Sequence, residues 1–232
     1  TAPSGGKGKL PFIHLQQRLR SSPEAFARTL EAHAQGLERK GGPVAREQGE
    51  LYRTAANASL DLDPETHGVP DEIQEVERAA RVREASALLS PTEEARKLLA
   101  AMRALAEKAR RKPDAKTLAL FAWLRENCCP AIGLGADTEA SRKWSDRRVI
   151  IFTEYADTKR YLLDLLQQAV AHTERGEERI MQFHGGMGDE SRDEVQRAFN
   201  AAPAVHPVRI LVATDAAREG VNLQAHSADL FH

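Results

Sequence analysis

Three short segments of the chain contain residue types that can hold a phosphate group. Residues 153–158 begin with a threonine hydroxyl, and three of the four residues at 185–188 are glycines, whose backbone N–H groups can approach an anion closely. Residues 214–223 offer a hydroxyl, an ion pair, a glycine and an amide that can bond a ribose or a base. Together the three segments predict binding of a phosphate-bearing ligand.

Each of these segments directly follows a short apolar run, at 149–152, 180–183 or 210–213. Continuous apolar runs of this length are typical of strands buried on both faces of a parallel sheet. The residues between them have helical periodicity, so the order strand, helix, strand, helix, strand predicts a right-handed parallel α/β layer. In such a layer the loops after the strands meet at one edge, where helix N-termini present N–H groups to anions.

Each segment taken alone also has a purely structural interpretation. The glycine pair at 185–186 is compatible with a plain tight turn, and residues 214–215 with a helix cap. Tyr155 can simply pack on the helix that follows it, and the charges at 218–219 can form a solvated ion pair. Three consecutive strand ends with phosphate-compatible loops are far less expected by accident, so the combined pattern favours a function.

Residues 10–112 have a different composition, rich in Ala, Leu, Glu and Arg and broken by glycine and proline at 41–43, 63–70 and 112–113. This pattern predicts four or five helices joined by short turns. Their sequence contains no cluster of His, Cys and carboxylate residues, so we interpret the region as structural or connecting.

Capping residues predict where several of these helices begin. Ser22 stands before Pro23, and Ser90 has capping-box spacing to Glu93. Behind these two starts, apolar residues recur at helical intervals, the pattern of an apolar stripe: Phe26, Leu30 and Leu37, then Leu98, Met102 and Leu105. Asp114 is predicted to cap a further helix that runs to about Asn127, with four residues facing inward: Leu118, Phe121, Ala122 and Leu124.

Composition narrows the class of protein. The chain has 232 residues, with 33 Lys and Arg against 34 Asp and Glu and a formal net charge of −1. It lacks the basic excess that often marks nucleic-acid binders, so local features must hold any polyanion. No apolar run approaches the roughly 18 residues of a membrane-spanning helix, and the adjacent cysteines at 128–129 favour reduced thiols. We therefore expect a cytoplasmic protein with no membrane partner.

Three motifs carry a resemblance to a known family. They read VIIFTEYADTKRYL at 149–162, QFHGGM at 182–187 with Arg192 downstream, and ILVATDAAREGVNLQ at 210–224. They resemble motifs IV, IVa and V of the second RecA-like domain of superfamily 2 helicases. The third motif is most similar to the Swi/Snf-type, RapA-like branch of DNA translocases.

The resemblance implies a fold and a domain division. We expect residues 114–232 to form a parallel-sheet RecA-like domain of the P-loop NTPase type, preceded by an all-α helical linker or insertion at 1–113. Because the chain starts at Thr1 and stops at His232 directly after an apolar stretch, we expect a fragment whose RecA-like domain is truncated at its C-terminus. An uncovered strand edge, an uncovered apolar helix face and marginal stability would follow.

The resemblance also implies roles for individual residues. Positions that contact the nucleic-acid backbone would be Thr153, Tyr155, Gly185, Gly186 and Thr214. Positions on the ATP-facing side would be Glu219, Gly220 and Asn222, with Asp215 and Arg218 coupling the two surfaces. Backbone contacts of this kind read phosphate rather than base sequence.

Two departures from the family pattern limit what this chain can do alone. No segment supplies the G-x-x-x-x-G-K-[ST] loop that cradles phosphates, and the acidic stretches at 71–74 and 193–196 follow no apolar strand. The arginine-finger motif of the family would come after a strand that begins near 228–231. We therefore expect no catalytic residue and no metal ligand in this chain, with ATP and Mg bound mainly by a missing first lobe.

The leading hypothesis is a fragment of an ATP-dependent DNA helicase or translocase of the bacterial cytoplasm or nucleoid. Its partners would be nucleic acid, DNA by resemblance, and the missing first RecA-like lobe. The alternative is a nucleic-acid-binding or protein-interaction module with no coupling to ATP. A third hypothesis is a two-lobed glycosyltransferase, but the motif at 210–224 argues against it.

Overall fold

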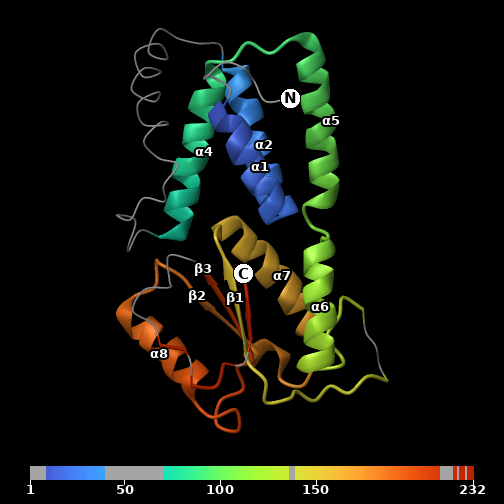
Figure 1. Ribbon diagram of the computed structural model, residues 1–232, viewed down its shortest axis with the longest axis vertical. Coiled ribbons are helices and arrows are strands. Elements are labelled where there is room, and N and C mark those ends of the chain that lie inside the picture. The colour runs from blue at the N-terminus through green and yellow to red at the C-terminus, as the bar shows by residue number, and fades with distance from the viewer. Residues whose placement is uncertain (1–8, 40–69, 136–138, 215–221, 224, 228) are drawn as a thin grey trace. The chain divides into compact units, whose positions relative to one another are not determined.

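The structure is a computed structural model that describes residues 9–39, 70–135, 139–214, 222–223, 225–227 and 229–232 (Figure 1). The chain forms two compact units. The helical unit comprises residues 1–67 and 72–112, and the α/β unit comprises residues 68–71 and 113–232.

The helical unit is built, in its described part, from four helices: α1 (Lys9–Ser21), α2 (Pro23–Glu38), α4 (Asp71–Ala87) and α5 (Glu93–Ala109). The first residue of α4, Asp71, belongs to the α/β unit. A small core cluster is formed by Ala27, Leu30 and Ala106. The all-α prediction is confirmed for the part of this region that the structure describes.

Capping residues set where α2 and α5 begin. Ser22 Oγ accepts a hydrogen bond from Ala25 N at 3.1 Å, and Pro23 is the first residue of α2, as the sequence predicts. The cap predicted at Ser90 is wrong, because Thr92 Oγ1 accepts from Ala95 N instead. The later start places two glutamates in the first turn, where the helix dipole favours negative charge.

The apolar stripe predicted on α5 is exposed rather than buried. Leu98, Met102 and Leu105 are 61%, 42% and 70% exposed. The apolar contact of α5 with α2 is made by Ala106 instead. Ion pairs add to it, since Arg110 Nε lies 2.7 Å from Glu24 Oε2 and Arg103 Nη2 lies 2.6 Å from Glu31 Oε2. The Arg110 pair helps to orient α5, because the largely buried Glu24 carboxylate needs its donors.

The α/β unit contains a parallel sheet with the strand order β2-β3-β1-β4. The strands are β1 (Val149–Thr153), β2 (Ile180–Phe183), β3 (Ile210–Thr214) and β4 (Asp229–Phe231). The helices are α6 (Ala115–Asn127), α7 (Ala156–Val170) and α8 (Asp189–Asn200), with a 3₁₀ turn η3 (Gly176–Glu178) before β2. The predicted parallel α/β fold is confirmed.

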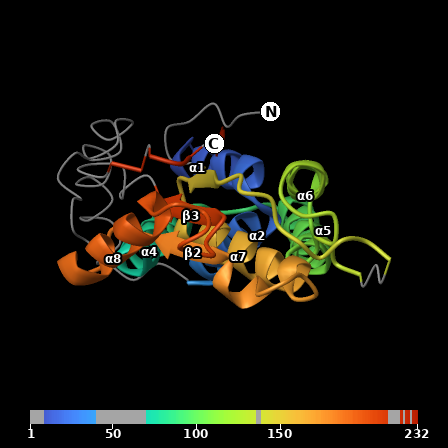
Figure 2. The same ribbon diagram turned by 90° about the horizontal axis from the view of Figure 1, so that it is seen from below.

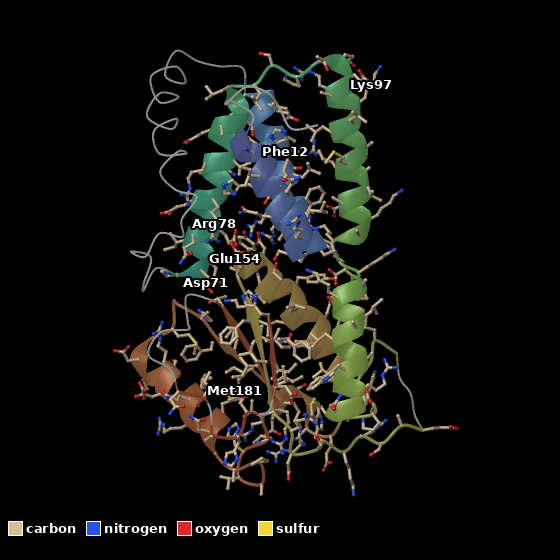
Figure 3. The ribbon with its side chains drawn as sticks, viewed as in Figure 1. Phe12, Asp71, Arg78, Lys97, Glu154 and Met181 are labelled. Atoms are coloured by element: carbon tan, nitrogen blue, oxygen red, sulfur yellow. The ribbon has the colours of Figure 1, made fainter. Side chains whose placement is uncertain are left out.

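Helices cover both faces of this sheet (Figures 1 and 2). Alternate strand residues such as Val149 and Ile151 join α6 and α7 in one core cluster. The residues between them, such as Ile150, join Phe199 of α8 in a second cluster, against which Met181 also packs (Figure 3). Burial on both faces explains why the strand runs are continuously apolar.

The inward face of α6 begins with a polar residue. Asp114 caps the helix as predicted, because its Oδ1 accepts from Thr117 N at 2.8 Å. The buried positions are Thr117, Leu120, Phe121 and Leu124, whereas Leu118 and Ala122, predicted to face inward, are exposed. The shift arises because Thr117 hydrogen-bonds Asp114 and lies 3.4 Å from the Tyr161 hydroxyl, which turns Leu118 outward.

The two adjacent cysteines follow α6 and are buried free thiols. Burial raises the pKa of Cys128 to about 12 and also raises the pKa of Cys129. Both thiols are therefore protonated at neutral pH and weakly nucleophilic.

A buried arginine directly precedes each of the first three strands. Arg148, Arg179 and Arg209 are 0%, 7% and 4% exposed. The strand starts are level, since both Val149 and Ile180 are register partners of Ile210. The three guanidinium groups therefore belong to one row at the amino edge of the sheet.

These guanidinium groups bind mainly backbone carbonyls. Arg148 donates to the carbonyls of Val208, Ala201 and His206 at 3.1, 2.5 and 3.2 Å, and to that of Phe199. Burial, with Arg209 nearby, lowers the pKa of Arg148 to about 10. The carbonyls of the loop after α8 thus depend on one buried cation for their hydrogen bonds.

Replacing this cation should destabilise the α/β unit selectively. Arg148→Met keeps an apolar stem but leaves several buried carbonyls without a donor, at about 1–3 kcal/mol each, so we expect the free energy of unfolding to fall by about 3 kcal/mol or more. Urea unfolding followed by tryptophan fluorescence measures this, because Trp123 and Trp144, both in the α/β unit, are the only tryptophans of the chain. The exposed neighbour Arg147, replaced in the same way, should cost less than about 1 kcal/mol, and equal losses for the two variants would contradict the role of Arg148.

His14 on α1 makes the helical unit sensitive to acid. Burial lowers the pKa of His14 to about 4, and three nearby cations act in the same direction while Glu75 opposes them. The cations are Arg81, Arg18 and Arg78. The imidazole is therefore neutral in the folded chain at neutral pH.

The unfolded chain takes up a proton at this histidine near pH 6.5, whereas the folded chain resists it until about pH 4. Stability should therefore fall as the pH drops through this window, by about 3.5 kcal/mol at about 1.4 kcal/mol per pKa unit. Thermal melts by far-ultraviolet circular dichroism at several pH values measure this, and His14→Gln should flatten the dependence. The exposed His172, changed to Gln, is the matched control and should leave the dependence as in the parent chain.

Candidate nucleic-acid interface

The last residues of β1 and β3 form the centre of the candidate site. Thr153 and Thr214 are register partners on adjacent strands and are 6% and 2% exposed. Thr153 Oγ1 lies 3.4 Å from the carbonyl oxygen of Tyr155. The buried Thr214 hydroxyl has no hydrogen-bond partner among the described residues. A buried hydroxyl in this state is costly unless a ligand or another group bonds it.

The glycine loop after β2 lies at the same edge. Phe183 of β2 is the register partner of Ala213, the residue before Thr214, so the loop starts beside the threonine pair. Met187 N donates to His184 O at 3.2 Å, which makes Gly185 and Gly186 the central residues of a tight turn. The structure thus brings the predicted positions 153, 185–186 and 214 to one edge of the sheet.

Arg192, noted in the sequence downstream of the glycine motif without a binding role, holds this turn. Arg192 of α8 donates from Nη2 to Gly185 O at 3.3 Å, and its guanidinium carbon lies 5.6 Å from the centre of the Phe183 ring. Its Nε is buried without a partner among the residues that the structure describes. The guanidinium therefore both fixes the glycine turn and offers a donor at the carboxyl edge. Arg192 lies in the first turn of the helix that follows the glycine loop, and this position was the sign in the sequence that it could bind there.

Tyr155 occupies the N-cap position of α7. Its side chain is 5% exposed, so the ring is buried in this conformation. Its carbonyl oxygen accepts from Lys159 N at 3.0 Å, the first helical bond of α7. Lys159 is a second cation near this edge that sequence reasoning did not single out.

Of the residues predicted to face ATP or to couple the two surfaces, the structure describes only Asn222. Asp215, Arg218, Glu219 and Gly220 lie outside the described residues. The carbonyl of Asn222 accepts from Gln196 Nε2 at 3.2 Å and from Asn200 Nδ2 at 2.5 Å. Asn222 is therefore bound to the second half of α8, and its contacts differ from those of the threonine pair.

The stretch from the loop before β1 to the end of β3 lies within one match to a known family. Residues 136–228 match the family model of the helicase conserved C-terminal domain. No curated protein and no solved structure matches the chain. The match supports a helicase C-terminal domain in this part of the chain, and the parallel α/β sheet is consistent with a RecA-like fold. Domains of this family interact with nucleic acid in general.

The described residues contain neither a metal-binding cluster nor a membrane-spanning helix. Within the described ranges, no three His, Cys, Asp or Glu side chains gather where they would hold a metal ion. None of the helices in the described part has the length and apolar character needed to span a bilayer. The acidic stretches at 71–74 and 193–196 lie on α4 and α8 and follow no strand of the sheet.

Proposed function

We propose that this chain is the lobe of an ATP-dependent DNA helicase or translocase that grips the nucleic-acid backbone and closes over ATP. The observation that carries the proposal is the carboxyl edge of the sheet, where the hydroxyls of Thr153 and Thr214 adjoin the glycine turn that Arg192 holds. This edge lies within the region that matches the helicase C-terminal domain. The motif at 210–224 supports the Swi/Snf-type, RapA-like branch of DNA translocases. The protein would act in the cytoplasm, at the bacterial nucleoid.

The chemistry of this edge suits phosphate rather than bases. Hydroxyl and backbone N–H groups donate to phosphate oxygens without reading base identity, and one guanidinium adds charge. The Thr214 hydroxyl and Arg192 Nε are two buried donors at this edge that have no partner among the described residues. Binding would therefore tolerate any sequence and would depend on salt through the cation.

ATP and Mg would be bound mainly by a first RecA-like lobe, the second proposed partner. This chain contains no Walker A loop, and its described residues include no carboxylate cluster that fits Mg. Its contribution to ATP would come from residues 215–222 and would be to close the site rather than to supply a catalytic residue. The proposed lobe extends over 114–232, and 1–113 would be a helical linker or insertion, although residues 70 and 71 group with the lobe.

The proposal predicts nucleic-acid binding that Arg192 strengthens. Arg192→Gln should weaken binding of fluorescein-labelled duplex DNA about 5–10-fold, because it removes a charged donor worth about 1–1.4 kcal/mol. The slope of log K against log salt should become shallower by about 0.7–0.9, which corresponds to one phosphate contact. Fluorescence anisotropy across a potassium chloride series measures both quantities.

The matched control is Arg197→Gln on the exposed surface of the same helix. This variant loses the same charge and should leave affinity and slope nearly unchanged. Thr214→Val removes a neutral donor and should weaken binding with the slope preserved. Absence of binding by the unaltered chain at low salt, or equal effects of the two arginine variants, would contradict the proposal.

Because ATP would be bound mainly by the first lobe, we expect the 232-residue chain to hydrolyse no ATP by itself. The physical reason is that a phosphate-cradling loop is needed to position the transferred phosphoryl group. Release of inorganic phosphate from Mg·ATP, with and without duplex DNA, measures this. The Arg192→Gln chain, purified identically, controls for a contaminating ATPase. If the unaltered chain alone hydrolysed ATP and duplex DNA stimulated that hydrolysis, the assignment of ATP binding to the first lobe would be wrong.

A further inference from the structure

A buried ion pair joins α7 to the start of α4. Lys159 Nζ lies 3.3 Å from Asp71 Oδ2, and the two side chains are 2% and 4% exposed. Both residues belong to the α/β unit, although 88 positions separate them. Lys159 lies in the first turn of α7, directly beyond the end of β1.

The residue before Asp71 contacts the glycine turn of the candidate interface. A Cβ added at Gly186 would lie 3.1 Å from both Cα and Cβ of Pro70, so the glycine permits this close approach. Residues 70–71 thus contact both the loop after β2 and the helix after β1.

The charge of Lys159 explains why an acid is needed there. A buried ammonium group is strongly unfavourable unless an anion and hydrogen bonds compensate it. Asp71 supplies that anion in the free chain. A phosphate oxygen supplies the same charge and the same acceptor, and lysine is a common phosphate ligand that acts as a point charge.

We propose that Lys159 is a phosphate ligand of the nucleic-acid interface and that Asp71 takes the place of a backbone phosphate until nucleic acid binds. The inference rests on the proposed function and adds a residue and a competing group to it. Nucleic acid displaces Asp71 from Lys159, and residues 70–71 then leave the glycine turn. Because part of the binding free energy is spent on this displacement, the apparent affinity of the free chain is lowered.

Asp71→Asn tests the competition. The amide still offers an oxygen to Lys159 but no charge, so Lys159 is released to a phosphate. We expect affinity for labelled duplex DNA to rise about 5–10-fold, and the slope of log K against log salt to steepen by about 0.7–0.9 for one more contact. The matched control is Asp164→Asn on the exposed surface of α7, which removes the same charge and should change neither quantity appreciably.

Lys159→Gln identifies the cation. In the Asp71→Asn chain this change should abolish the gain, whereas in the chain with Asp71 intact its effect should be smaller, because Asp71 already neutralises Lys159. An equal loss in both backgrounds, or an Asp71→Asn chain that behaves like Asp164→Asn, would overturn the inference. ATP as a competitor separates the two phosphate sources, and a gain seen for ATP but not for duplex DNA would also overturn it.

A measurement on the unaltered chain does not depend on whether the variants fold. Hydrogen–deuterium exchange of peptides that contain residues 70–73 should become faster when duplex DNA is added, since Asp71 is displaced. Exchange that is unchanged or slower in these peptides, with DNA bound, would refute displacement and leave the proposed function standing. Failure of every variant and of the unaltered chain to bind DNA would overturn both.

Discussion

Three buried guanidinium groups at the amino edge of the sheet are the constraint on which the α/β unit depends. Arg148, Arg179 and Arg209 each precede a strand, and backbone bonds link them, from Val149 N to Arg209 O and from Arg209 N to Arg179 O, both at 2.9 Å. Each cation must find acceptors because it is buried, and it finds them in the carbonyls of neighbouring loops. The strands therefore start level, so the loops at their carboxyl ends lie together at one edge of the sheet.

The elements that were predicted correctly from the sequence depend on interactions between residues close together along the chain. The strand runs at 149–152, 180–183 and 210–213 are strands within one residue at each end, because continuous apolar runs have few alternatives to burial in a parallel sheet. The caps at Ser22 and Asp114 are confirmed because each needs only the next three residues. The convergence of Thr153, Thr214 and the glycine turn follows from parallel topology alone.

The elements that were missed depend on residues distant in the sequence. The stripe on α5 faces away from α2 because Arg103 and Arg110 pair with glutamates of α2, and periodicity counts apolar residues without weighing such pairs. The inward face of α6 begins at Thr117 because of the Tyr161 hydroxyl. The contact of Asp71 with Lys159 spans 88 positions, and a pattern read along the chain gives no sign of it.

A near-neutral composition is compatible with a polyanion partner because affinity depends on which charges are already compensated. Of the cations near the carboxyl edge, Lys159 is matched by a carboxylate, whereas Arg192 binds a carbonyl oxygen. A cation bound to a carbonyl keeps its full charge, so it can attract a phosphate at once. A cation paired with a carboxylate attracts a phosphate only if the carboxylate leaves. Its contribution to the binding free energy is then the difference between its ion pair with the phosphate and its ion pair with the carboxylate. The formal charge of −1 counts both cations equally, and for that reason it says little about how strongly the proposed interface would bind a nucleic-acid backbone.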